Sequence, residues 1–513
     1  MELPRSFGIL LHPTSLPGPW VCGVLGKEAR AFLDWLREAG AGFWQVLPLG
    51  PTGFGDSPYQ SFSAFAGNPY LIDPEDLIRR GWLAEEEPPK IPQERVDYGF
   101  LYRWKWDLLR RAFQGFLRRG DPEERREFSR FWEKEKEWLW DYALFMALKD
   151  RFGGRPWNEW PPEFRHRKAS VLVDFEEDEN VLFHAWTQWI FFRQWQEIRN
   201  CAHKQGIKII GDIPIFVAYD SADVWAHPEL FELDSEGRPT VVAGVPPDYF
   251  SPTGQRWGNP LYRWPVHEAE GFRWWIARVR QTLRLFDVLR IDHFRGFAAY
   301  WEIPAEEPTA VRGRWVPAPG EKLFQTMLRE LGELPILAED LGVITPDVEE
   351  LRDKFGFPGM RVLQFAFDGK PDNPHLPENF PEHGRVVVYP GTHDNDTALG
   401  WYRTVSEEVR TRVQQYLSAQ GIIASKEEDI PWALISLAFR SRAVLAVIPM
   451  QDVLGLGSEA RLNYPSRAEG NWTWRLLSKP KPAQRLAELA RETHRLARTF
   501  GDVANKHGQV YTG

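Results

Sequence analysis

The chain has 513 residues, more than one hydrophobic core usually holds, so we expect either one large barrel with insertions or two to three domains. Its hydrophobic content of 43% and charged content of 26% are typical of globular proteins. A net charge of −9 argues against nucleic acid and anionic membrane surfaces as partners.

Eight short apolar segments occur along the chain, and each is followed by glycine, proline or a charged residue. Near-continuous apolar segments of this length are typical of parallel strands that are covered on both faces. In chain order they are FGILL (7–11), FWQVLPL (43–49), IKIIG (207–211), FDVLRI (286–291), LPILA (334–338), MRVLQFAF (360–367), GRVVVY (384–389) and AVLAVIP (443–449).

Helical signals lie between these strands. Residues 27–41 carry apolar residues at helical spacing and stop near Gly40, and residues 345–356 begin with Thr345 as N-cap and Pro346 at the first helical position. Alternating strands and helices predict an α/β protein with a (β/α)8 TIM barrel. A doubly wound sheet is the alternative, and it is disfavoured because no glycine-rich phosphate loop follows the first strand.

The alternation stops between residues 84 and 200. A loop-like stretch rich in glutamate and proline is followed there by charged, Trp-rich helical segments, one of which begins at Asp121 with Glu124 at the N3 position. Too few residues follow the eighth strand for a C-terminal β-sandwich domain. We therefore expect 1–83 to be the first part of the barrel, 84–200 a mainly helical insertion, and 201–513 the rest of the barrel with lid loops and C-terminal helices.

Two features bear on the cellular compartment. The cysteines, Cys22 and Cys201, allow one disulfide at most and form no metal-type cluster, which favours a reducing environment. The apolar run near the N-terminus is too short for a signal-peptide core, and no apolar stretch is long enough for a transmembrane helix. We expect a cytoplasmic protein that does not bind membranes.

Four of the predicted strands end with an acid, and this is where the catalytic groups of a TIM barrel lie. A single acid at a strand end is often only a helix N-cap, but four on one barrel predict a site. Nearby cations offset their mutual repulsion, so a metal is not needed, although His393-Asp394-x-Asp396 places hard ligands close together. The acids are Asp212, Asp292, Glu339 and Asp394, and the cations are Arg290, His293 and His393.

Paired carboxylates flanking a scissile bond are the machinery of retaining glycoside chemistry, in which one is the nucleophile and the other holds a proton. Arg290 next to Asp292 would keep that carboxylate ionised, as a nucleophile requires. Glu339 has no adjacent cation in the sequence and suits the proton-holding role. Asp394 could bind sugar hydroxyls and distort the ring, and the two histidines either donate to hydroxyls or support other groups.

The motifs RIDHFRG, LAEDLG, GTHDND and GDIPIF resemble the catalytic regions of the α-amylase superfamily. The residue sequences of these motifs are similar to those of amylomaltases, the 4-α-glucanotransferases also called disproportionating enzymes. The resemblance covers nearly the whole chain, and its further matches are HPTSLPG (12–18), PTGFGDSPYQSFSAFAGNPYLID (51–73), VVAGVPPDYFSPTGQRWGNPLY (241–262) and GSEARLNYP (457–465).

The resemblance implies a role for each site residue. Asp292 would be the nucleophile, Glu339 the general acid and base, and Asp394 the transition-state stabiliser. The subsite for the reacting glucosyl ring would contain Tyr59, Asp212, Arg290 and His393, and the acceptor side Ser57, Gln255, Trp257, His293, Asp340 and Asn463. Phe54 stands where some relatives carry tyrosine at a second glucan-contact site. Tyr59 and Trp257 could instead be core aromatics, and Asn463 a turn cap.

The carboxylates alone do not distinguish hydrolysis from transfer. The segment GVPPDYFSPTGQRWGNP suits a structured lid that excludes water, with Phe250 as a lid residue or a loop anchor. The resemblance favours transfer between α-1,4-glucans (maltooligosaccharides, amylose, starch or glycogen), with glucose as a further acceptor and no cofactor. One alternative is an amylase-type α-1,4-glucan hydrolase. The other is a non-catalytic glucan-binding protein, and the full set of acids argues against this second alternative.

Overall fold

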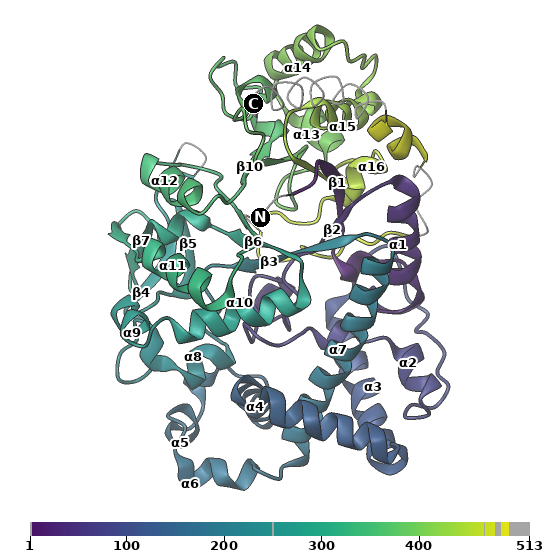
Figure 1. Cartoon of the computed structure of the whole chain (residues 1–513). Coiled ribbons are helices and arrows are strands. Elements are labelled where there is room, and N and C mark those ends of the chain that lie inside the picture. Colours follow the sequence, from purple (N-terminus) through teal and green to yellow (C-terminus); the bar gives the residue numbers. More distant parts are fainter. Residues whose placement is uncertain (1–2, 249–250, 466, 478–483, 492–513) are drawn as a thin grey trace, which may run out of the picture.

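The sheet at the centre of the molecule closes into a barrel (Figure 1). The computed structural model describes residues 3–248, 251–465, 467–477 and 484–491. The barrel strands are β1 (Ser6–Leu10), β2 (Phe43–Gln45), β3 (Lys208–Pro214), β6 (Val288–Asp292), β9 (Ile336–Ala338), β10 (Gly359–Val362), β11 (Val386–Tyr389) and β12 (Leu445–Pro449). Each overlaps one of the predicted apolar segments.

Neighbouring barrel strands run parallel in the order β10-β11-β12-β1-β2-β3-β6-β9. The amide of Ala338, at the end of β9, donates to the carbonyl of Pro358 at 2.9 Å, directly before β10 begins. The first and last strands of this order are therefore neighbours, and the predicted (β/α)8 barrel is confirmed.

Helices surround the barrel, and their apolar residues, which recur at helical spacing, face it. In α1, Phe32, Leu33 and Leu36 face the core, and Gly40 ends the helix with a φ of +77°. The helices are α1 (Lys27–Ala39), α2 (Pro74–Arg79), α3 (Tyr98–Arg119), α4 (Pro122–Arg151), α5 (Pro162–Arg165), α6 (Ala169–Leu172), α7 (Glu179–Lys204), α8 (Ala222–Ala226), α9 (Trp264–Ala269), α10 (Arg273–Leu285), α11 (Gly320–Leu331), α12 (Pro346–Lys354), α13 (Ala398–Thr404), α14 (Glu407–Ala419), α15 (Ile430–Arg440) and α16 (Met450–Val453).

Helix α12 begins at Pro346, as predicted, but its capping differs from the prediction. Thr345 holds the N-cap position with an extended backbone, and its side chain makes no capping hydrogen bond. Its Oγ1 instead accepts from Arg295 Nη2 at 3.3 Å. Thr345 therefore fastens the loop after β9 to the loop after β6.

Long helices lie between β2 and β3 in the chain, and α4 to α6 occupy the lower part of Figure 1. Helix α4 opens with the predicted reciprocal capping box between Asp121 and Glu124. Phe116 of α3 and Trp186 of α7 share one hydrophobic core with Trp44 of the barrel. These helices thus extend the barrel core, and the division of the chain at 83 and 200 stays a prediction.

A second sheet was not anticipated from the sequence. Its four strands are antiparallel in the order β5-β4-β7-β8, with the bounds β4 (Val241–Val245), β5 (Gln255–Pro260), β7 (Ala299–Pro304) and β8 (Arg314–Pro317). The segment predicted to be a lid, 244–260, therefore supplies β5 and the end of β4. This sheet holds Gln255 and Trp257 at fixed positions on β5.

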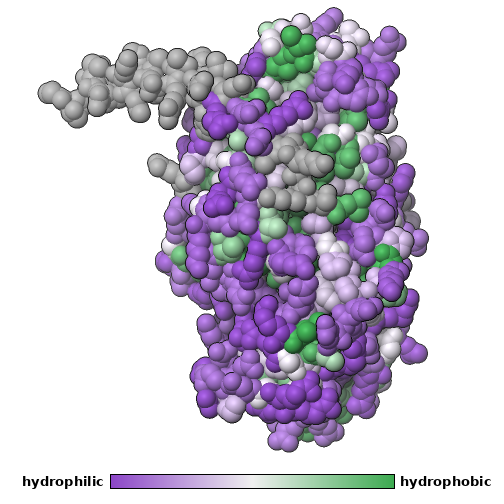
Figure 2. Space-filling view, turned by 90° about the vertical axis from the view of Figure 1, so that its right-hand side faces the viewer, coloured by the Kyte–Doolittle hydropathy of each residue, from purple (hydrophilic) through white to green (hydrophobic). Residues whose placement is uncertain are grey.

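The surface is mainly hydrophilic on the face that Figure 2 shows, with hydrophobic side chains in small separate groups. Within the described ranges, no helix is both long and apolar enough to cross a membrane.

Candidate active site

The predicted acids gather at the carboxyl ends of the barrel strands. Asp212 lies on β3, Asp292 ends β6, Glu339 directly follows β9, and Asp394 lies in the loop between β11 and α13. A cavity of about 720 Å³ opens over these ends. The predicted residues that line it are Ser57, Tyr59, Gln255, Trp257, Asp292, His293, His393, Asp394 and Asn463. Asp212, Arg290 and Glu339 do not line it but contact residues that do.

Arg290 links two of the acids. Its Nη1 lies 2.7 Å from Asp212 Oδ2 and its Nη2 lies 3.0 Å from Asp292 Oδ1. Burial alone would lower the pKa of Arg290, but the two carboxylates outweigh it and hold that pKa well above its ordinary value. The guanidinium therefore stays charged and binds both carboxylates.

Replacing Arg290 by methionine is expected to lower the free energy of unfolding by about 3–5 kcal/mol, because it leaves the buried Asp212 without its cation. Urea unfolding at pH 7 measures the change. The control is Arg30→Met, which removes an exposed pair with Glu197 at 2.9 Å and is expected to cost less than about 1 kcal/mol. Equal losses in the two variants would contradict the role given to Arg290.

Tyr59, Asp212 and His393 form a second contact group at the edge of the cavity. The Tyr59 hydroxyl donates to Asp212 Oδ2 at 2.8 Å and lies 2.9 Å from His393 Nε2, which can donate to it in turn. The two rings stack with their centroids 5.2 Å apart. Burial and the charge of Asp292 raise the pKa of Asp212 to about 7, although Arg290 opposes the shift. Burial lowers the pKa of His393, so its ring is neutral.

Glu339 is held by backbone amides. The amide of His293 donates to its Oε2 at 2.7 Å, and the amide of Leu341 donates to its Oε1 at 2.8 Å. His293 reaches this position with a φ of +56°, which is uncommon for a residue with a side chain. Burial, and then the charge of Asp292, raise the pKa of Glu339 to about 8 despite Arg290 and these amides. Glu339 therefore carries a proton at neutral pH.

The Asp394 side chain is 44% exposed, compared with 31% for Asp292 and 0% for Asp212. Asn463 Nδ2 donates to its Oδ1 at 2.7 Å, and His393 Nε2 lies 3.4 Å from its Oδ2. Arg461 Nη2 donates to its main-chain carbonyl at 2.7 Å. The carboxylate is thus presented to the cavity in a fixed direction.

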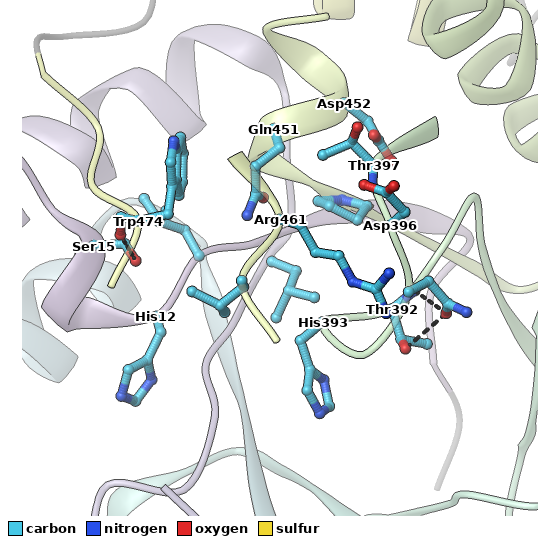
Figure 3. Close-up of a pocket in the computed structure, with 15 residues that line it drawn as sticks. His12, Ser15, Thr392, His393, Asp396, Thr397, Gln451, Asp452, Arg461 and Trp474 are labelled. Carbon is cyan, nitrogen blue, oxygen red and sulfur yellow. Dashed lines mark hydrogen bonds between the residues drawn. The ribbon is translucent and has the colours of Figure 1, made fainter. Parts of the chain in front are cut away.

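The loop that carries His393 and Asp394 is supported from behind by the segment after β12. Figure 3 shows the small pocket between them, with His393, Asp396, Asp452 and Arg461 around it. Ser458 Oγ donates to Asp396 at 2.6 Å, and Asp452 accepts from the Ala398 amide at 2.7 Å. These contacts fix the backbone on which the third acid is mounted.

The predicted acceptor side is built on β5. Trp257 Nε1 donates to Gln255 Oε1 at 3.1 Å, and the edge of the Trp257 ring meets His293 with centroids 4.7 Å apart. Burial lowers the pKa of His293 to about 3, so the ring is neutral. Ser57 Oγ accepts from the Tyr59 amide at 3.2 Å. Polar and aromatic groups therefore stand together beside Asp292.

Asp340 does not line this cavity, and two further predicted residues, Phe54 and Phe250, fall partly or wholly outside the described structure. Asp340 is buried, with its Oδ2 2.6 Å from Arg352 Nη1 and its Oδ1 accepting from the Met360 amide at 2.7 Å, so it joins β9 to β10. Phe54 begins the turn Phe54–Asp56, but its side chain lies outside the described part of the structure. Phe250 lies outside the described residues altogether.

The cavity also has walls that the sequence did not indicate. One is formed by residues after β3 and in the helical stretch, and another by the segment after Asn463. Phe216 is the last residue of the motif GDIPIF, but the sequence predicted no role for it, and no motif marks the other positions named next. The unpredicted lining residues include Asn158, Glu159, Phe216, Tyr219, Arg467 and Trp472. Within the described part of the chain, no three His, Cys, Asp or Glu side chains are placed to hold a metal ion.

Comparisons with known proteins agree with this geometry. A family model described as 4-alpha-glucanotransferase matches residues 11–479. The 4-alpha-glucanotransferase of Thermus thermophilus is 64% identical over 501 residues, which cover 97% of this chain and 100% of that protein. The structure of amylomaltase from Streptococcus agalactiae in complex with acarbose superposes with a TM-score of 0.91 at 38% identity, covering 96% of this chain and 99% of that one. The amylomaltase of Corynebacterium glutamicum, 18% identical with a TM-score of 0.75 over 96% of this chain and 75% of its own, shares the fold.

Proposed function

The chain belongs to the 4-alpha-glucanotransferase family, and we propose that its paired carboxylates break and remake an α-1,4-glucosidic bond by double displacement. The enzyme transfers a segment of an α-1,4-glucan to the 4-hydroxyl of another glucan or of glucose. The contrast between two neighbouring acids carries the mechanism. Arg290 Nη2 lies 3.0 Å from Asp292 Oδ1 and places a positive charge beside it, whereas burial and the charge of Asp292 raise the pKa of Glu339 to about 8.

In the first step Glu339 gives its proton to the glycosidic oxygen while Asp292 attacks C1 of the glucosyl unit. Asp292 Oδ1 is held by Arg290, which leaves Oδ2 as the attacking atom. The C1–oxygen bond breaks, and a β-linked glycosyl ester forms. The shortened glucan leaves as an alcohol that carries the proton.

In the second step Glu339, now ionised, takes the proton from the 4-hydroxyl of the acceptor. The acceptor oxygen attacks C1 and the ester bond to Asp292 breaks, so the product has the α configuration again. Both steps use only side chains of this chain and need no cofactor.

The remaining predicted residues bind and shape the substrate in this scheme. Tyr59, Arg290 and His393, together with Asp212, would hold the glucosyl ring, supported by their contacts around the Tyr59 hydroxyl. Asp394, oriented by Asn463, would bind the ring hydroxyls and stabilise the distorted transition state. Gln255 and Trp257 would hold the acceptor and keep water from the ester.

Incubation with maltotriose alone tests the function directly. We expect glucose together with a ladder of longer maltooligosaccharides, because each transfer lengthens one chain as it shortens another. Chromatography of the products without added metal measures this. Glucose and maltose with nothing longer would establish hydrolysis instead, and an unchanged substrate would favour the non-catalytic alternative.

The pH dependence should report on Glu339. Because this group must be protonated in the free enzyme, kcat/KM for maltotriose is expected to decline as pH rises through about 8, by about tenfold per pH unit above it. Initial rates between pH 5 and 10 measure the profile. A profile that stays level to pH 10 would contradict the proposed acid.

We also propose a domain role and a location for the enzyme. Residues 84–200 would act as an insertion that builds part of the cavity wall, supported by the presence of Asn158 in the lining. A cytoplasmic location is supported by the free thiols of Cys22 and Cys201.

A further inference from the structure

The cavity that contains Asp292 continues to a wall built by the helical stretch. The turn Trp157–Glu159 and the loop after β3 both line it, the latter with Tyr219 and Asp220. In Figure 1, α5, which follows this turn, lies in the lower part of the molecule, away from β6. The lining of the cavity thus includes residues of the helical stretch and of the loop after β3 as well as Asp292.

This wall is fastened by several hydrogen bonds. Trp157 Nε1 donates to the Tyr219 carbonyl at 2.8 Å, and the Trp157 amide donates to Asp220 Oδ1 at 3.3 Å. Asp220 Oδ2 lies 2.6 Å from the buried Nζ of Lys149 in α4. The Tyr219 hydroxyl donates to the Gly237 carbonyl at 2.6 Å, and its ring lies 5.2 Å from that of Trp157. The turn and the loop therefore form one ordered surface.

Two side chains of this surface are left without a partner. The Asn158 amide and the Glu159 carboxylate line the cavity and make no hydrogen bond or ion pair with the described residues. Tyr219 is half-buried, and its ring is tilted by 56° against that of Trp157. Unpaired polar groups beside an ordered aromatic ring match the hydroxyls and apolar faces of a sugar.

We propose that Asn158, Glu159 and Tyr219 form a distal sugar-binding subsite, here called the rim subsite, that binds glucosyl units far from the bond being broken. The inference rests on the proposed function and adds to it a basis for chain-length preference. A short glucan at the acids does not reach the rim subsite, whereas a longer chain gains its contacts. The helical stretch thereby favours long substrates.

The Asn158→Ala variant tests the rim subsite. Loss of one hydrogen-bonding group is expected to lower kcat/KM for maltoheptaose about fivefold, mainly through KM, and to change the value for maltotriose by less than about twofold. Tyr219→Ala is expected to lower the maltoheptaose value about tenfold. The matched control is Glu177→Ala, an exposed acid of the same stretch that is not among the lining residues, which should leave both substrates unaffected.

The two failures are distinguishable. If the wild-type enzyme forms no product longer than maltotriose, the proposed function is overturned. A wild-type enzyme with the normal product ladder, and an Asn158→Ala variant with an unchanged ratio between the two substrates, overturns the rim subsite alone. Equal losses on both substrates overturn it as well. Asn158 is half-buried and its side chain has no described partner, so this variant keeps the test valid if Tyr219→Ala fails to fold.

Discussion

Replacing Asp292 by asparagine is expected to reduce kcat on maltotriose by about 10⁴-fold or more. The amide cannot form the glycosyl ester, and no neighbouring group offers a replacement, because Asp394 is held by Asn463 and Asp212 by Arg290. Glucan binding should persist, since asparagine has nearly the same shape and its Oδ1 still accepts from Arg290. Turnover is measured by product chromatography and binding by calorimetry.

The Asp174→Asn variant, at an exposed acid outside the cavity lining, is the matched control and should keep full activity. If Asp292→Asn keeps more than about a tenth of the wild-type turnover, the assignment of Asp292 as the nucleophile is contradicted. Loss of binding together with turnover would instead indicate that the site had rearranged.

Replacing Glu339 by glutamine is expected to lower kcat/KM for maltotriose about 10³-fold, because the leaving oxygen then departs without a proton. A substrate with a good leaving group, such as α-maltosyl fluoride, needs no such help in the first step. The rate of ester formation from this fluoride should therefore fall far less than the rate of the reaction with maltotriose. Pre-steady-state release of fluoride measures that step.

The pH profile supplies the independent check on Glu339. The variant should lose the decline near pH 8 that the wild type is expected to show. Added azide should raise its turnover, because this nucleophile attacks the ester without a general base. Equal losses on maltotriose and on the fluoride, with the pH profile intact, would rule out the acid and base role.

The barrel could be predicted because its signals are local. Each strand is a short apolar run, and the loss of apolar character marks its end. The boundaries were less accurate, since strand pairing also depends on neighbours. The segment 43–49 was predicted as one strand, but only Phe43–Gln45 pairs with β1 and β3, and the segment 360–367 becomes a helical turn after Val362.

The second sheet could not be predicted in the same way. Its strands include VVAGV, which two prolines follow directly, and QRWGNP, and these glycines and prolines resemble a loop. They are stabilised by antiparallel pairing between β4 and β7, which lie far apart in the chain. Pairing of this kind is a tertiary effect that a local pattern does not contain.

The placement of the acids followed from topology, since parallel strands bring their carboxyl ends together. Glu339 and Asp340 show where that reasoning stops. Successive residues at a strand end point to opposite faces, so Glu339 turns toward His293, which lines the cavity, and Asp340 toward Arg352 and Met360. Asn158 was beyond prediction, because only the packing of α4 and the loop after β3 brings it to the cavity.

In the proposed mechanism, transfer proceeds through a covalent ester on Asp292. The most direct measurement is mass spectrometry of the Glu339→Gln variant after reaction with α-maltosyl fluoride, followed by peptide mapping. The mechanism predicts a maltosyl adduct on the peptide that contains Asp292. This adduct should disappear when a glucan acceptor and azide, as a second nucleophile, are added. An adduct on another acid, or fluoride release without any adduct, would contradict it.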